Sequence, residues 1–228
     1  MKSKKLSVIV LMITIIGFMI GCSKDKGNST NEKLKDPNNL SEDKAFIDLT
    51  KETYGYLLFI STTVKSNSLS LPTVQTQLYD LQSKNLTFTE QMNNIDIIFK
   101  GNFSTRLNEH MIAYKKNWEY IKSKYSTIHQ NVLEKECAEV LANNYTKQNG
   151  SKNVAKKLAL VEDCNWRYYL CAGAATAVAI LCHAGCDTTA LALTWGLGIP
   201  ACVALCGTLQ VLAIVQCHDT YCTPINPN

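Results

Sequence analysis

Residues 41–145 repeat apolar side chains at helical spacing, and this pattern predicts a bundle of helices with no sheet. The first helix is expected to begin after Ser41, whose hydroxyl can cap a helix. Glu42 and Asp43 follow directly, and the helix dipole favours negative charge in a first turn. The apolar face of this helix would consist of Phe46, Ile47, Leu49, Tyr54, Leu57 and Leu58.

Two further helices have recognisable start and stop signals. Pro72 is expected to open one that runs to about Lys84, because proline is well tolerated in a first helical turn. Thr87 and Glu90 have the spacing of a capping box, so they predict the start of the next helix. Gly101 is expected to end that helix.

A fourth segment has the most regular apolar period in the chain. Its apolar residues are spaced alternately by four and three positions: Leu107, Met111, Tyr114, Trp118, Ile121, Tyr125, Ile128 and Val132. A seam of this length is typical of a coiled-coil dimer or of one long helix inside a bundle. We favour the bundle, because the same chain offers other helices for this one to pack against.

The composition changes after the polar stretch TKQNGSKN, and residues 146–163 are therefore expected to be a linker or a connecting helix. Residues 164–228 contain eight of the ten cysteines and only three formal charges, Arg167, Asp187 and Asp219. An apolar, cysteine-rich region thus follows the bundle.

The eight cysteines of this region are spaced almost symmetrically. The residue numbers of three pairs add up to 388, and those of the outermost pair add up to 386: Cys186–Cys202, Cys182–Cys206, Cys171–Cys217 and Cys164–Cys222, in that order. Antiparallel pairing of two segments produces a constant sum of this kind. Of the many possible connectivities, we therefore predict these four disulfides.

Helix geometry agrees with this pairing, because steps of four, seven and eleven residues return to nearly the same face of an α-helix. The first four cysteines would share one stripe and three others a second stripe: Cys164, Cys171, Cys182 and Cys186, then Cys202, Cys206 and Cys217. Cys222 lies off its stripe, so the chain would have to leave the helix after Cys217. The predicted fold class is all-α, a helical bundle followed by a disulfide-stapled antiparallel helical hairpin whose turn contains GLGIP.

Other chemistry for these cysteines is less favoured. A CxxxC pair can bind zinc, but uncharged surroundings and an oxidising compartment favour disulfides. The sequence has no CxxC redox motif and no CxxCH haem motif. His183 and His218 flank the predicted ladder, and we expect them at the surface or in a cap rather than as ligands. We therefore assign no metal, no cofactor and no catalytic residue.

A membrane-spanning hairpin is an alternative for the same region. From Thr188 to Cys217 there is neither charge nor histidine, and this length is sufficient to cross a bilayer. Gly196, Gly198 and Pro200 interrupt the stretch, and Ala, Thr and Cys outweigh Leu and Ile. We disfavour a stable span, and leave open an apolar hairpin that inserts on demand or docks on the bundle.

The beginning of the chain has the features of a secretory signal. Three lysines precede the uncharged stretch Leu6–Ile20, and the small residue Gly21 stands before Cys22. The last residues of this segment, MIGC, resemble the lipobox of bacterial lipoproteins. The resemblance implies cleavage of residues 1–21, lipidation of Cys22 and a membrane-anchored, extracytoplasmic protein of the cell envelope.

Residues 22–40 are polar and are expected to form a flexible tether. The net charge of +4 falls to about +1 when the three lysines of the signal are removed, leaving 20 basic and 19 acidic residues. A balance so close to neutral argues against a nucleic-acid partner, which requires a concentrated basic patch.

Two resemblances concern the C-terminal region. The CxxxC spacing, repeated once, is similar to that of disulfide-stapled helical hairpins such as the plant α-hairpinins. The stretch CHAGCDTTALALTWGLGIPACVALC, with the later CHDTYC, resembles the cysteine-rich apolar domain of halocin-type bacteriocins over about the last 60 residues. The second resemblance implies an antibacterial peptide or its precursor.

The sequence contains no HExxH, GxSxG, phosphate-loop or Rossmann motif, so we do not expect an enzyme. The first interpretation is a lipid-anchored protein that presents the hairpin as a binding or interaction module, with a protein or a membrane as partner. The alternative is a bacteriocin-like, membrane-active protein whose C-terminal region is the active peptide. Cys137 is left over, and we expect a buried thiol rather than a dimer bridge.

The lipobox resemblance makes a direct prediction. Cys22→Ser removes the thiol that would carry the acyl chain, so the protein should stay uncut or become soluble. Membrane fractionation and the mass of the mature N-terminus measure this. A variant that is processed normally and remains membrane-bound would contradict the lipoprotein interpretation.

Overall fold

The computed structural model describes residues 37–125, 127–145, 162–193 and 199–224. The predicted signal peptide, Cys22, most of the tether and the segment 146–161 lie outside the described residues.

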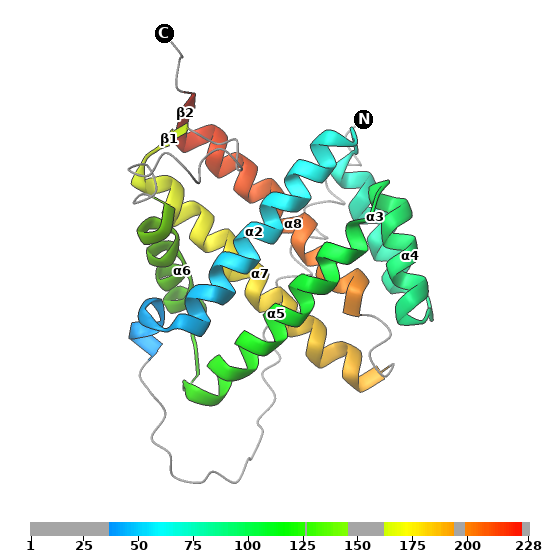
Figure 1. Cartoon of the computed structure of the whole chain (residues 1–228), viewed down its shortest axis with the longest axis horizontal. Coiled ribbons are helices and arrows are strands. Elements are labelled where there is room, and N and C mark those ends of the chain that lie inside the picture. The colour runs from blue at the N-terminus through cyan, green and yellow to red at the C-terminus, as the bar shows by residue number, and fades with distance from the viewer. Residues whose placement is uncertain (1–36, 126, 146–161, 194–198, 225–228) are drawn as a thin grey trace, which may run out of the picture. The chain divides into compact units, whose positions relative to one another are not determined.

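The described part of the chain is helical apart from two short strands and the connecting turns, as the sequence predicts. In chain order the elements are η1 (Pro37–Glu42), α2 (Lys44–Ser66), α3 (Leu71–Gln82), α4 (Phe88–Phe99), α5 (Phe103–Lys124), α6 (Gln130–Tyr145), β1 (Glu162–Cys164), α7 (Trp166–Leu193), α8 (Ile199–Tyr221) and β2 (Cys222–Pro224). Helices α7 and α8 form the predicted hairpin, and Figure 1 shows α2 and α5 crossing over it.

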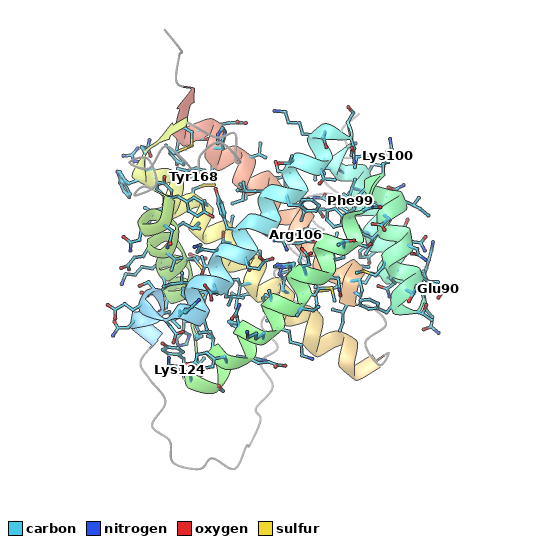
Figure 2. The ribbon with its side chains drawn as sticks, in the orientation of Figure 1. Glu90, Phe99, Lys100, Arg106, Lys124 and Tyr168 are labelled. Atoms are coloured by element: carbon cyan, nitrogen blue, oxygen red, sulfur yellow. A yellow bond between two sulfur atoms is a disulfide. The ribbon has the colours of Figure 1, made fainter. Side chains whose placement is uncertain are left out.

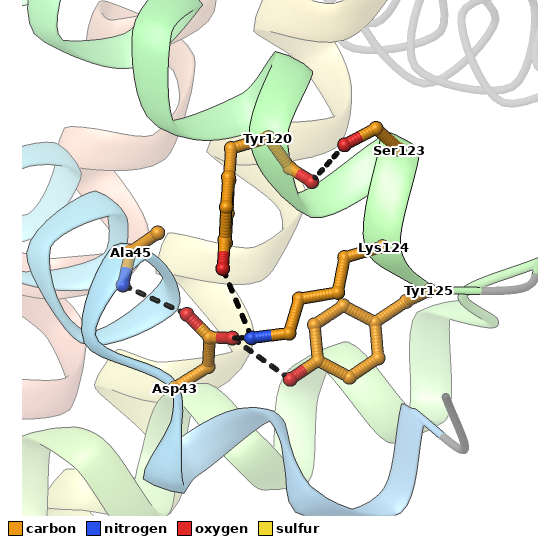
Figure 3. Close-up of polar contacts among 6 residues, drawn as sticks. All are labelled: Asp43, Ala45, Tyr120, Ser123, Lys124 and Tyr125. Atoms are coloured by element: carbon orange, nitrogen blue, oxygen red, sulfur yellow. Dashed lines mark hydrogen bonds and ion pairs between the residues drawn. The ribbon is translucent and has the colours of Figure 1, made fainter. Parts of the chain in front are cut away.

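The start of α2 differs from the prediction. The N-cap is Asp43, whose carboxylate accepts a hydrogen bond from the backbone N–H of Ala45 at 2.9 Å, and not Ser41. The second carboxylate oxygen of Asp43 accepts hydrogen bonds from Lys124 and from the hydroxyl of Tyr125, as Figure 3 shows. These contacts from α5 hold Asp43 at the helix start, a tertiary constraint that the local sequence does not contain.

Ser41 lies inside the 3-10 turn η1, and its backbone N–H donates to Glu136 of α6 at 2.8 Å. Leu40 in the same turn is completely buried. The predicted tether therefore does not extend to residue 40, because the chain is already packed from η1 onward.

The capping box of the third predicted helix is confirmed at the start of α4. Thr87 accepts from the backbone of Glu90, and Glu90 accepts from the backbone of Thr87. The helix ends at Lys100, which adopts the left-handed conformation with φ 55° and ψ 44°. Gly101 follows the stop and does not occupy the left-handed position that was expected of it.

The fourth predicted segment is not one helix. Helix α5 ends at Lys124, because Tyr125 turns to an extended conformation with ψ 146° and donates its hydroxyl to Asp43. A new helix, α6, begins at Gln130. Tyr125, Ile128 and Val132 still pack against the same core as α5, although the helix is interrupted between them.

The apolar seam on α5 is core within a single chain. Leu107, Tyr114, Trp118 and Ile121 are all buried in it. Burial of this seam inside one chain supports the bundle interpretation rather than a coiled-coil dimer, since a dimer seam would be exposed in the monomer.

The hairpin and the bundle share one core. A single cluster of buried residues includes Leu57 and Ile60 of α2 together with Ala204 and Val211 of α8. Helix α7 contacts α6 and α2, and α8 contacts α2, α3 and α4.

Two glycines allow the backbones to approach closely where the hairpin meets the bundle. A Cβ placed on Gly173 of α7 would lie 2.5 Å from the backbone nitrogen of Ala138 in α6. A Cβ on Gly207 of α8 would lie 2.4 Å from the side chain of Ile60 in α2. The first clash is with backbone, so it cannot be relieved by a change of rotamer.

This packing predicts opposite effects for two alanine substitutions in α7. Gly173→Ala should lower the free energy of unfolding by about 1–3 kcal/mol, because it forces α6 away from α7. Gly185→Ala meets no atom within 4 Å and should raise stability by up to about 1 kcal/mol through helix propensity. Urea denaturation of both variants measures this, and equal effects would contradict the close α6–α7 contact.

Candidate functional site

Four disulfides join the two arms of the hairpin, and they link the four pairs that the symmetric cysteine spacing predicts. The pairs are Cys164–Cys222, Cys171–Cys217, Cys182–Cys206 and Cys186–Cys202. Their Cα atoms are 4.1, 5.7, 5.8 and 5.8 Å apart, respectively. The inner three bridges connect helix to helix, so α7 and α8 are held side by side over most of their length.

The outermost bridge is built differently from the prediction. Cys164 does not share the helical stripe of α7, because it lies in β1, before the helix begins at Trp166. Its partner Cys222 lies in β2, where the two residues face each other across an antiparallel pair of strands. The chain does leave α8 before Cys222, but at Tyr221 rather than directly after Cys217.

Three sulfur atoms gather at the inner end of the ladder. The Sγ atoms of Cys186, Cys202 and Cys206 all lie within 4.8 Å of one another. Each of these cysteines is already in a disulfide, and zinc is bound by thiolates. The cluster is therefore two stacked bridges rather than a metal site in this oxidised form.

The side of the hairpin turned away from α2, here called the outer face, is apolar. It lies roughly half a turn round α7 from the buried residues Ala172 and Ala179. On it lie the partly or fully exposed residues Leu170, Ala174 and Val178 of α7 with Leu209 and Leu212 of α8, while Leu181 and Leu205 at its edges pack partly against the core. Leu170 and Leu212 each expose 48% of their surface.

No charged side chain interrupts the outer face. Helix α7 carries none between Arg167 and Cys186, and α8 carries none before Asp219. Each arm is long and apolar enough to cross a membrane by length and composition, and about half of each stretch, 56% and 50%, is buried within the protein. These features are common to membrane-associated helices and to core helices of soluble proteins.

One end of the outer face has a different chemistry. Trp166 exposes 65% of its surface at the start of α7, and the guanidinium of Arg167 lies 5.8 Å from its ring centroid. At the matching end of α8, the ring of His218 lies 3.6 Å from the carboxylate of Asp219. Aromatic and charged groups thus meet at this end of the described hairpin.

His183 is not at the surface, contrary to the prediction. It is buried in the core, where its Nδ1 lies 3.3 Å from Nε2 of His110. The other nitrogen of His110, Nδ1, lies 3.1 Å from the carboxylate of Glu52, which also pairs with Arg106 at 2.6 Å. A polar chain thus runs from α2 and α5 to α7, beginning near Arg106 in Figure 2.

Burial and hydrogen-bond partners shift the pKa values of Glu52, His110 and His183. Burial acts to raise the pKa of Glu52, but hydrogen bonds from His110 and Arg106 outweigh it, and the pKa is lowered. Burial lowers the pKa of His110, against the opposing effect of Glu52. Burial, and then His110, lower the pKa of His183 well below its ordinary value, while the backbone of Val203 acts in the opposite direction. At neutral pH the carboxylate is therefore ionised and both imidazoles are neutral.

The ring of Tyr56 stacks on His110, with the ring centroids 4.1 Å apart. This contact covers one face of the imidazole and fixes its plane within the core. Sequence analysis missed Glu52, Arg106 and His110 because they stand alone on separate helices. One signal was present, since His110 lies three residues after Leu107 and four before Tyr114, on the buried stripe of α5.

Cys137 of α6 is a buried free thiol 3.7 Å from the hydroxyl of Thr50. Burial raises the pKa of Cys137 to about 12, so the thiolate is not formed at neutral pH. Because the side chain is completely buried, it cannot form a dimer bridge in this fold.

No family model, curated protein or solved structure matched this chain.

The buried histidine pair predicts a loss of stability in mild acid. Both pKa values are lowered in the folded state, so the unfolded chain binds more protons below the ordinary value of about 6.5. As the pH falls through about 6.5 toward 5, the free energy of unfolding should therefore decrease, because the unfolded chain gains protons that the buried imidazoles resist.

His110→Phe keeps a ring against Tyr56 and should flatten this pH dependence, whereas His129→Asn, at an exposed position, should leave it unchanged. Urea titrations at each pH provide the measurement. Identical slopes for wild type and His110→Phe would show that the pair does not control acid stability.

Proposed function

We propose that this chain is a non-enzymatic, lipid-anchored protein of the cell envelope that presents the outer face of its disulfide-braced hairpin to a lipid membrane. The observation that carries the proposal is the absence of charge along the described part of this face, from Tyr168 to Cys186 in α7 and from Ile199 to His218 in α8. An exposed apolar surface of this extent is typical of an interaction site, since soluble proteins rarely leave such surfaces uncovered.

Lipid suits the outer face better than a protein partner does. Protein interfaces usually combine aromatic or arginine anchors at their centre with hydrogen-bonding groups at the rim. Among the residues whose side chains the structure describes, the outer face contains mostly Ala, Leu and Val, and its aromatic and charged groups lie at the end near Trp166 and Arg167. Tryptophan beside a cation is the chemistry favoured at the boundary between lipid and water.

The disulfide ladder supports the same role. Without covalent links, two helices rich in alanine would gain little from packing on each other, and their apolar side chains could rearrange into the core. Four bridges hold the two antiparallel arms side by side, so each arm keeps a fixed face toward the other.

The expected acyl chain on Cys22 adds a second attachment. A tether converts binding of the hairpin into an intramolecular event at a high effective concentration. A weak apolar contact of the outer face would then be occupied most of the time.

The second candidate is a bacteriocin-like protein whose hairpin enters the target membrane. The observation that favours it is that α7 and α8 are each long and apolar enough to cross a bilayer. The resemblance to halocin-type domains supports it as well. The two candidates differ in outcome, because surface contact leaves a vesicle sealed and insertion of a toxin makes it leak.

The membrane proposal predicts that the chain with Cys22→Ser, which lacks an acyl anchor, still binds vesicles of phosphatidylcholine and phosphatidylglycerol. Leu170→Glu and Leu212→Glu place a charge on the outer face and should each weaken binding at least tenfold, because a carboxylate must be desolvated. Flotation of the vesicles with bound protein measures the affinity.

Ile97→Glu is the matched control, because Ile97 exposes 74% of its surface on α4, which is not part of the hairpin, and the variant should keep wild-type binding. Release of an entrapped dye by the wild-type chain would favour the bacteriocin-like alternative. Wild-type protein that does not float with vesicles would rule out the membrane as partner.

A further inference from the structure

Two facing CxxxC motifs bring four cysteines together at the inner end of the disulfide ladder. They are Cys182 and Cys186 of α7 with Cys202 and Cys206 of α8. The Cα atoms of each bridged pair are 5.8 Å apart, and residues four apart along a helix are separated by a rise of about 6 Å. The four Cα atoms therefore form a compact four-sided arrangement.

The sulfur atoms of these cysteines are close enough to surround a single ion. Sγ of Cys186 and Sγ of Cys206 belong to different bridges and lie 3.7 Å apart. Sγ of Cys202 lies within 4.8 Å of both, and Sγ of Cys182 is bonded to that of Cys206. A tetrahedral zinc ion with Zn–S bonds of about 2.3 Å holds its sulfurs about 3.8 Å from one another. The spacing of the two bridges thus matches the edge of a zinc–sulfur tetrahedron.

The same cysteines are thiols before the bridges form. Disulfides form and persist in oxidising compartments, so a newly made chain is reduced. In that state nothing covalent joins α7 to α8, although their pairing contributes to the core. Cys186 and Cys206 are buried, whereas Cys182 and Cys202 are partly exposed. The four thiols therefore lie at the boundary of the core, where an ion can reach them.

We propose that the two CxxxC motifs of the reduced chain bind one zinc ion through their four thiolates. Binding releases the four thiol protons and leaves the oxidation state of sulfur and zinc unchanged. The ion would join α7 to α8 at the place where two disulfides join them in the oxidised chain. It would therefore hold the arms of the hairpin side by side until the bridges form.

The ligand set argues against other metals. Calcium and magnesium prefer oxygen ligands, whereas thiolates favour softer ions such as zinc. Four sulfurs in a tetrahedral arrangement are typical of zinc or of an iron–sulfur centre. Three of the sulfurs already lie within 4.8 Å of one another, which leaves room for one ion but not for a cluster of several irons.

The test uses the full chain, reduced under argon and titrated with Co²⁺ and then with Zn²⁺. One equivalent of Co²⁺ should give the visible absorption of a tetrahedral thiolate site, and one equivalent of Zn²⁺ should displace it. Zinc should also slow proteolysis of the reduced hairpin, because metal binding stabilises the folded pairing of its helices. The oxidised chain should give no such absorption, since its bridged sulfurs are not thiolates.

Two double variants locate the site. Cys182→Ser with Cys206→Ser removes two of the four ligands and should weaken Co²⁺ binding at least tenfold. Cys171→Ser with Cys217→Ser is the matched control, because it removes another helix-to-helix bridge of the same ladder and should keep wild-type affinity. Absence of saturable Co²⁺ binding to the reduced chain, equal affinity of the two variants, or the same absorption from the oxidised chain would each overturn the proposal.

Discussion

The pairing of α7 with α8 is the constraint on which the rest of the structure depends. Both helices are apolar on nearly every side, so periodicity alone would not tell either of them which face to bury. The four disulfides settle the pairing, and the faces left over are then divided between the bundle and the outside. Helix α2 packs against both arms, α6 covers α7, and α3 and α4 contact α8.

Close packing around the hairpin follows from small residues as much as from large ones. Gly173 brings the backbone of α6 against α7, and Gly207 admits the side chain of Ile60 from α2. Because an added methyl group at Gly173 would meet backbone, the bundle and the hairpin are held closely together there. The interaction surface that we propose is thus a product of packing on the opposite side of the same two helices.

The chain of Glu52, His110 and His183 is the polar exception inside this core. It is tolerated because its members pair with one another, because the backbone of Val203 interacts with His183, and because Arg106 balances the carboxylate.

Local signals in the sequence determined much of this protein. The capping box of Thr87 and Glu90 is made by residues three apart, and the symmetric spacing of cysteines records a pairing that any antiparallel hairpin must satisfy. The break at Tyr125 and the cap at Asp43 were decided by tertiary structure, since each depends on a hydrogen bond between residues about eighty positions apart. The same holds for His183. We predicted it at the surface or in a cap, because the neighbouring cysteines do not indicate how deeply this part of the helix is buried. Only the packing of α5 against the hairpin brings His110 to it, and burial of both rings is a property of three helices together rather than of any one segment.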